Sequence, residues 1–152
     1  MFNRIVLILI ITGFIYAQDE QKVVLITGTA YGIGKSTAEL LIDKGHIVYG
    51  GDILVEENLY LNDIGGTALE MDVTNQEHID KAINQIISEQ GRVDVLVNNA
   101  GLGVYGAIED VSMEDIYYQY DVNLFGLARV TKAVLPYMRE EESGLIINIS
   151  SV

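Results

Sequence analysis

The sequence predicts an α/β fold in which helices cover both faces of a parallel β-sheet. From residue 22 onward, short apolar runs typical of strands alternate with amphipathic helical patterns, which indicates repeated β–α–β units. A glycine-rich turn at residues 27–34 follows the first apolar run and opens the first helical pattern. The chain has 152 residues, of which 49% are hydrophobic, enough for one domain with a substantial core.

Each strand is predicted from a short run of apolar or β-branched residues. The run at residues 93–97 is continuous, which is typical of a strand buried on both faces. The second strand is expected to end where the run 50–52, Gly-Gly-Asp, begins. The five expected strands are residues 23–27, 47–49, 68–71, 93–97 and 145–149.

The helices between these strands are predicted from apolar spacing and capping residues. The first should cover residues 33–44, and a short helix or loop should follow at 55–62. The next opens with a capping box in which Thr74 is the cap, carries an apolar stripe, and ends at Gly91.

A long helix is predicted before the last strand. Ser112 should cap it, and it should reach about Met138 with a bend at Pro136. The chain stops directly after the fifth strand, whereas a parallel sheet needs a covering crossover there. The domain, residues 22–152, is therefore expected to be incomplete at its C-terminal side.

The glycine-rich turn is a candidate phosphate-binding element. Gly28 would permit a tight turn, Gly32 would let a diphosphate approach the backbone, and Gly34 would let the helix pack closely on the strand. The N–H groups and positive end of the helix would face the anion. Thr29, Tyr31 and Ile33 belong to the same candidate site. A purely structural glycine turn is the alternative.

Polar residues also end the other predicted strands, at the edge where parallel sheets bind ligands. The Asp52 carboxylate can accept hydrogen bonds from ribose hydroxyls and would repel a 2′-phosphate. The other candidates are Asp72, Val73, Asn98, Asn99, Ala100 and Gly101. Two of them have structural alternatives, because Asp52 could simply close its strand and Asp72 could belong to the turn before Thr74.

Composition excludes several classes of function. The formal net charge of −13 would repel nucleic acid and anionic membranes over most of the surface. The chain has no cysteine, which rules out disulfides and thiolate metal sites, and its two histidines, His46 and His78, are far apart in sequence. We therefore expect no metal site and no nucleic-acid partner.

The motifs together resemble those of the short-chain dehydrogenase/reductase family. They are T-G-x-x-x-G-I-G at 27–34, D-V at 72–73, N-N-A-G at 98–101 and N-I-S-S at 148–151, with Asn123 between the last two. The resemblance covers residues 22–152. It implies a Rossmann-type doubly wound sheet of about five strands in the order 3-2-1-4-5. It also implies hydride transfer between NAD(P) and a small-molecule alcohol or carbonyl substrate, and contact of Asp72 and Val73 with adenine.

The resemblance also assigns catalytic residues. It implies that Ser151 hydrogen-bonds the reacting oxygen, with Ser150 as its structural neighbour, and that Asn123 supports a proton relay. A polar Asn123 within a helix patterned for burial needs hydrogen-bond partners, unless it is simply exposed. NAD is favoured over NADP for two reasons. Asp52 would repel a 2′-phosphate, and positions 31, 53 and 54 hold Tyr31, Ile53 and Leu54, where NADP-preferring relatives tend to have an Arg or Lys.

The family's Tyr-x-x-x-Lys pair follows its catalytic serine, and residues 1–152 contain this pattern only at Tyr31 and Lys35, inside the glycine turn. We interpret that match as a coincidence. Residues 1–152 alone are therefore expected to show no dehydrogenase turnover. Reduction of NAD with any simple alcohol, followed by absorbance, would contradict this expectation.

The first 17 residues are predicted to be a signal peptide or an apolar leader. Arg4 precedes the apolar run 5–11, and Ala17 precedes a polar acidic stretch. Export, an uncleaved membrane anchor and a leader on a cytoplasmic protein all remain open. Export conflicts with the cofactor, because soluble nicotinamide cofactors are scarce outside the cytoplasm, so localisation stays undecided.

Three readings of function follow. The chain is the N-terminal part of a dehydrogenase, a non-catalytic dinucleotide-binding remnant, or an exported protein that uses the fold for interaction. The resemblance implies a homo-oligomer for a full-length protein, paired through the long helix at about 115–138.

Overall fold

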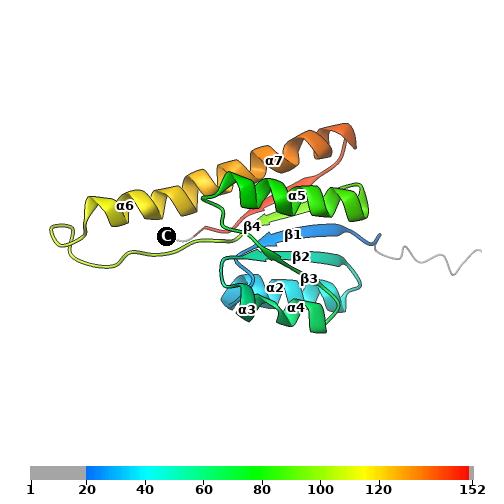
Figure 1. The fold of residues 1–152 in the computed structure, drawn as a ribbon, viewed down its shortest axis with the longest axis horizontal. Coiled ribbons are helices and arrows are strands. Elements are labelled where there is room, and N and C mark those ends of the chain that lie inside the picture. Colours follow the sequence, from blue (N-terminus) through cyan, green and yellow to red (C-terminus); the bar gives the residue numbers. More distant parts are fainter. Residues whose placement is uncertain (1–19, 151–152) are drawn as a thin grey trace, which may run out of the picture.

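Five short apolar segments pair side by side into one parallel sheet in the order β3-β2-β1-β4-β5 (Figure 1). The computed structural model describes residues 20–150. The predicted fold class and strand order are confirmed. The strands are β1 Val23–Thr27, β2 Ile47–Asp52, β3 Thr67–Glu70, β4 Val95–Asn98 and β5 Leu145–Asn148.

Helices cover both faces of this sheet (Figure 1). Alternate residues of β1 point to opposite faces, so Leu25 packs in a cluster with residues of α5 and α7, while Val24 and Ile26 pack in a second cluster with residues of α2 and α4. The helices are α2 Gly32–Asp43, α3 Val55–Asn58, α4 Tyr60–Asp63, α5 Gln76–Gln90, α6 Met113–Tyr120, a π-helix η2 Asp121–Gly126 and α7 Leu127–Glu140.

Strand β2 is longer than predicted, because its two glycines lie inside the strand and do not end it. A Cβ atom on Gly50 would lie 2.2 Å from Leu61 Cδ1, and one on Gly51 would lie 2.6 Å from Met71 Sδ. The glycines therefore admit close neighbours on both faces. As a result β2 extends to Asp52, which brings this carboxylate to the carboxyl edge of the sheet.

The cap of α5 is Asn75, not Thr74 as predicted. The Asn75 side chain accepts hydrogen bonds from the backbone N–H groups of Glu77 and His78, at 2.9 and 3.4 Å. The Thr74 hydroxyl is used differently, since it donates to Asp72 Oδ1 at 2.7 Å. An asparagine is as good a cap as a threonine, so the sequence pattern did not distinguish the two positions.

The predicted long helix is interrupted by η2, while α7 continues through Pro136 to Glu140. Two contacts are made by residues of η2. Gly126 lies against Val73, where a Cβ atom would be 2.6 Å from Val73 Cγ2. The Asn123 side chain is bonded to the loop before α6, as described below. A π-helical turn, which inserts one residue into an α-helix, is frequent at functional sites.

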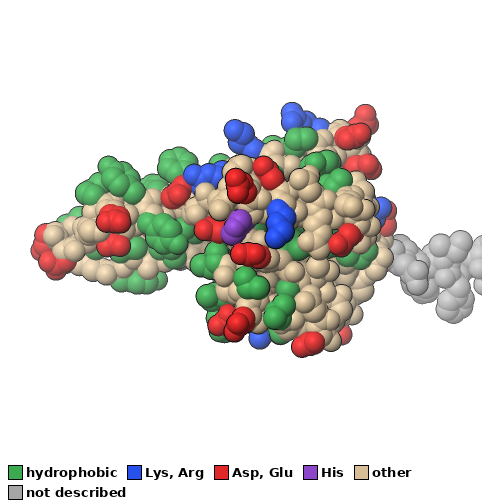
Figure 2. Space-filling model, in the orientation of Figure 1, with side chains coloured by type: hydrophobic (Ala, Val, Ile, Leu, Met, Phe, Trp, Pro, Cys, Tyr) green, Lys and Arg blue, Asp and Glu red, His purple; other side chains and the backbone are tan. Residues whose placement is uncertain are grey.

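The segment around α6 projects from the rest of the fold (Figure 1), and Figure 2 shows hydrophobic side chains gathered on it. Among them, Tyr105 is 93% exposed and Tyr117 is 67% exposed. Within residues 20–150, no helix combines the length and apolarity needed to span a bilayer. The predicted leader, residues 1–17, lies outside the described residues.

Candidate dinucleotide site

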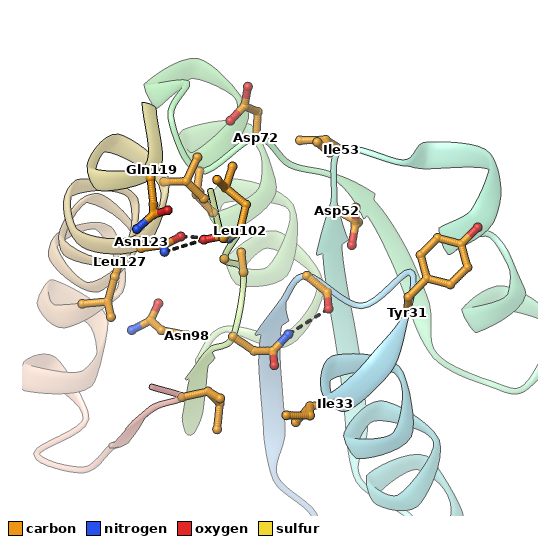
Figure 3. Close-up of a pocket in the computed structure, with 18 of the residues that line it drawn as sticks. Tyr31, Ile33, Asp52, Ile53, Asp72, Asn98, Leu102, Gln119, Asn123 and Leu127 are labelled. Carbon is orange, nitrogen blue, oxygen red and sulfur yellow. Dashed lines mark hydrogen bonds between the residues drawn. The ribbon is translucent and has the colours of Figure 1, made fainter. Parts of the chain in front are cut away.

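The carboxyl ends of the strands surround a cavity of about 880 Å³ (Figure 3). Most of the residues predicted from the sequence line it, although they come from segments far apart in the chain. These are Gly28, Tyr31, Ile33, Asp52, Asp72, Val73, Asn98, Asn99, Ala100, Gly101 and Asn123. Ser150 also lines the cavity, while Ser151 lies outside the described residues.

The glycine turn has the backbone geometry that its sequence predicts. Gly28 and Gly32 have φ values of +75° and +60°, a region that side chains disfavour. A Cβ atom on Gly34 would lie 2.0 Å from Gly28 O, whereas one on Gly32 would meet nothing within 4 Å. Gly34 therefore permits close packing of α2 on the turn, and Gly32 leaves its outer side open.

Three residues of the predicted set, Thr29, Gly32 and Gly34, are not among those that line the cavity. Thr29 is fully buried, and its hydroxyl donates to Asn58 Oδ1 at 2.8 Å. The Thr29 carbonyl accepts the hydroxyl of Tyr60 at 3.0 Å. Burial, reinforced by the carboxylates of Glu39 and Asp52, raises the pKa of Tyr60 to about 12, so this phenol remains a neutral donor. Thr29 thus stabilises the turn from its buried side and does not line the cavity.

Asp52 lies at the edge of the cavity, and both of its carboxylate oxygens are engaged by backbone groups. Oδ2 accepts the N–H of Ala30 at 2.9 Å, and Oδ1 accepts the N–H of Leu54 at 3.0 Å. Each carboxylate oxygen has a second lone pair for a ligand hydroxyl. The two bonds fix the carboxylate between the glycine turn and the start of the next loop.

Asp72 is one of the residues that line the cavity, and its side chain also shapes the turn before α5. Its Oδ1 accepts both the backbone N–H and the hydroxyl of Thr74, at 2.8 and 2.7 Å. The predicted role of Asp72 in the turn before Thr74 is therefore confirmed for Oδ1, and its contact with adenine stays a prediction.

Asn99 fastens the end of β4 to the glycine turn. Its Nδ2 donates to the carbonyl oxygens of Thr27 and Gly28, both at 2.9 Å. In return, the Thr27 hydroxyl oxygen accepts the backbone N–H groups of Asn99 and Ala100, both at 3.0 Å. These four hydrogen bonds hold the end of β4 and the glycine turn, which form two walls of the cavity, in a fixed position relative to each other.

Asn123 is exposed to the cavity side, and its partners are the two backbone groups of Leu102. Asn123 Oδ1 accepts the Leu102 N–H at 2.9 Å, and Nδ2 donates to the Leu102 carbonyl at 2.8 Å (Figure 3). This pair of bonds joins η2 to the segment after Gly101. Asn123 is therefore exposed, as the alternative expectation stated, and its amide is nevertheless hydrogen-bonded on both sides to a loop residue.

Several apolar lining residues were not singled out from the sequence. They are Leu102, Val122, Leu127 and Ile149, all of which line the cavity. Because such residues resemble core residues in sequence, only their position at strand ends and in the interrupted helix could have indicated them. Lys35, the lysine of the Tyr31–Lys35 match, lies over the Tyr60 ring at 4.3 Å.

The arrangement suits an elongated ligand that carries both a diphosphate and ribose hydroxyls. N–H groups of an open glycine turn lie at the start of a helix, a carboxylate lies beside them, and the cavity continues to a region of mixed amide and apolar groups. Within residues 20–150, no cluster of three or more His, Asp or Glu side chains could hold a metal ion.

The chain belongs to the short chain dehydrogenase family, whose sequence model matches residues 22–152. It is 48% identical over 134 residues to the 3-ketodihydrosphingosine reductase of Bacteroides thetaiotaomicron, covering 88% of this chain and 48% of the relative. It is 39% identical over 140 residues to the 3-oxoacyl-[acyl-carrier-protein] reductase FabG of Thermotoga maritima, covering 88% and 56%. The chain therefore spans about half the length of the curated relatives it matches.

Solved structures give the same result. A short-chain dehydrogenase from Streptomyces avermitilis matches with a TM-score of 0.80 and 38% identity, over 86% of this chain and 49% of that one. The ligand-free aldohexose dehydrogenase of Thermoplasma acidophilum matches with a TM-score of 0.76 and 40% identity, over 86% and 49%. Homologues of this chain are thus oxidoreductases.

Proposed function

We propose that this chain forms the cofactor-binding part of an oxidoreductase that exchanges a hydride between NAD and an alcohol or carbonyl substrate, with NADP as the alternative cofactor. One observation carries the proposal. The glycine turn, Asp52, Asp72 and the segment 98–101 converge on one cavity at the carboxyl edge of the sheet. When bound there, the nicotinamide group supplies or accepts the hydride, and the protein supplies binding and orientation.

Each wall of the cavity has a proposed role. The turn from Gly28 to Gly34 and the start of α2 hold the diphosphate through backbone N–H groups. Asp52 accepts the hydroxyls of the adenosine ribose, and Asp72 with Val73 lies against the adenine. Ala100 and Gly101 have little or no side chain, which leaves room for the second ribose.

The catalytic assignments remain proposals. Ser151 would hydrogen-bond the reacting oxygen of the substrate and stabilise charge on it. Asn123 would act on proton transfer indirectly, because its side chain is already bonded to Leu102 and holds the helix at a fixed distance from the loop.

The substrate that we propose is a ketone on a long alkyl chain. The relative with 48% identity is named for the reduction of 3-ketodihydrosphingosine. The apolar residues Leu102, Val122, Leu127 and Ile149 that line the cavity favour such a chain over a sugar. Turnover of 3-ketodihydrosphingosine and of a sugar, compared in a protein extended to the full length of its relatives, would test the choice.

NADH should bind residues 1–152 more tightly than NADPH by about tenfold or more, because the Asp52 carboxylate accepts ribose hydroxyls and repels a 2′-phosphate. Asp52→Asn should weaken NADH binding and bring the two affinities within about threefold of each other, since hydrogen bonds to charged groups are the stronger ones. Titration by nicotinamide fluorescence measures both dissociation constants.

The matched control for this titration is Asp43→Asn, which removes the same charge at the end of α2, away from the cavity. It should leave the preference for NADH unchanged. Equal affinity of the unaltered protein for NADH and NADPH would contradict the role given to Asp52. If neither cofactor binds, the interaction-protein reading is favoured over both the dehydrogenase and the remnant.

A further inference from the structure

Asn58, at the end of α3, is a fully buried polar residue whose side chain joins this short helix to the glycine turn and to β2. Its Oδ1 accepts the hydroxyl of Thr29 at 2.8 Å, and its Nδ2 donates to the carbonyl of Gly50 at 2.8 Å. A further contact, from Nδ2 to the carbonyl of Leu69, is longer, at 3.5 Å. Asn58 is not among the residues that line the cavity, so it can act on a ligand only through other residues.

The sequence of β2 makes room for this contact. A Cβ atom on Gly50 would lie 2.4 Å from Thr29 Oγ1, so the hydroxyl reaches Asn58 only because position 50 has no side chain. Both partners are buried, and the bond between them satisfies polar groups that water does not reach.

The hydrogen bonds of Asn58 close a ring that contains Asp52. Thr29 precedes Ala30, whose N–H is bonded to Asp52 Oδ2 at 2.9 Å. The other oxygen, Asp52 Oδ1, accepts the N–H of Leu54 at 3.0 Å, and the Leu54 carbonyl accepts the backbone N–H of Asn58 at 3.0 Å. The side chain and the backbone of one buried asparagine thus hold the two segments whose N–H groups fix the carboxylate.

Apolar packing does little to hold the segment between Asp52 and Asn58. The side chains of Ile53, Leu54 and Val55 are 59%, 42% and 40% exposed. Helix α3 has four residues, too few for a helix that is stable by itself. The hydrogen bonds of Asn58 therefore determine the path of this segment, and with it the position of the Leu54 N–H that Asp52 requires.

We propose that Asn58 is a positioning residue for the Asp52 carboxylate and thereby sets the preference of the site for an unphosphorylated ribose. The inference rests on the proposed function, because the ligand of Asp52 is the adenosine ribose. Two neighbouring ribose hydroxyls need carboxylate oxygens that already point at them, and a group that is ordered before binding loses less entropy on binding. A carboxylate released from the ring also turns away from a 2′-phosphate and repels it less.

Asn58→Leu keeps most of the volume and removes the side-chain hydrogen bonds. In the 152-residue chain it should weaken NADH binding about tenfold and bring the affinities for NADH and NADPH within about threefold of each other. Titration by nicotinamide fluorescence measures both. The matched control is Asn62→Leu in α4, because the Asn62 side chain also holds a backbone group, the N–H of Ala68 at 2.9 Å. It should leave the preference for NADH unchanged.

A second variant distinguishes positioning from general stabilisation. In a chain that already carries Asp52→Asn, Asn58→Leu should change the ratio of the two affinities by less than about twofold, because the carboxylate on which it acts is gone. A residue that only stabilised the fold would change the ratio by the same factor with or without Asp52.

Thr29→Val opens the same ring at the hydroxyl and keeps the shape of the side chain, so it tests the proposal if Asn58→Leu does not fold. It should lower the preference for NADH by about threefold. Amide hydrogen exchange without any ligand gives a further readout. The N–H groups of Ala30 and Leu54 should exchange roughly tenfold faster in either ring variant than in Asn62→Leu.

The proposal is overturned if the ring variants keep the preference for NADH, or if Asn62→Leu loses it to the same extent. Undiminished action of Asn58→Leu in the Asp52→Asn chain would overturn it as well. If the unaltered chain binds neither cofactor, the proposed function is wrong, and the exchange rates then decide by themselves whether Asn58 positions Asp52. Rates equal to those of the control would show that it does not.

Discussion

Gly34→Ala is expected to unfold the protein or to lower its free energy of unfolding by at least about 3 kcal/mol. A Cβ atom at this position would lie 2.0 Å from Gly28 O and 2.5 Å from Asn99 Nδ2. Neither atom can move cheaply, because one belongs to the backbone of the turn and the other is bonded to Thr27 and Gly28. Urea unfolding followed by circular dichroism measures the loss.

Helix propensity alone predicts that Gly34→Ala raises the free energy of unfolding, so the sign of the measured change distinguishes propensity from the steric clash. Gly34 lies inside α2, where replacing glycine by alanine normally stabilises a helix by about 0.5–1 kcal/mol. The control is Gly91→Ala, at φ +77° with no neighbour within 4 Å, which should cost only about 1 kcal/mol. A Gly34→Ala protein more stable than Gly91→Ala would contradict the close packing of turn and helix.

Thr27→Val should lower the free energy of unfolding by roughly 2–5 kcal/mol, because two backbone N–H groups lose their acceptor. The residue is 1% exposed, and its hydroxyl oxygen accepts from both Asn99 and Ala100. Valine has nearly the same shape, so the loss reports the hydroxyl and not a cavity. NADH affinity should fall as well, since the segment 98–101 lines the cavity.

Thr27→Ser is the matched variant, because serine keeps the hydroxyl and loses one methyl group. It should cost about 1 kcal/mol and leave NADH affinity close to that of the unaltered protein. If the serine and valine variants were equally destabilised, the loss would come from packing. The hydrogen bonds to the Thr27 hydroxyl would then not be what stabilises the contact between β4 and the turn.

Much of the fold could be predicted from the sequence, because its determinants are local or periodic. The alternation of apolar runs and helical patterns sets the parallel sheet, and the positions of Gly28 and Gly34 set the turn. Strand ends and caps were less certain. Gly50 and Gly51 look like a strand terminator in sequence, but the need to admit Leu61 and Met71 keeps them inside β2.

The site was predictable as a set of strand-end residues but not as a set of contacts. Asp52 and Asp72 are recognisable by position, and yet the bonds that Asp52 makes to Ala30 and Leu54 depend on how β2 meets the turn. The π-helix at η2 has no signature in the sequence. It lies where Gly126 packs against Val73 and Asn123 is bonded to Leu102, contacts that form only on folding.

The bonds between Asn99 and the glycine turn also constrain the order of events during synthesis. They join residues separated by 71 and 72 positions, whereas β1 and β2 can pair as soon as residue 52 is available. A nascent chain therefore contains the glycine turn well before it contains Asn99, whose side chain is hydrogen-bonded to that turn. If the turn binds a dinucleotide as proposed, it should have little affinity for it until about 100 residues have been synthesised, and cofactor binding would then come late in folding.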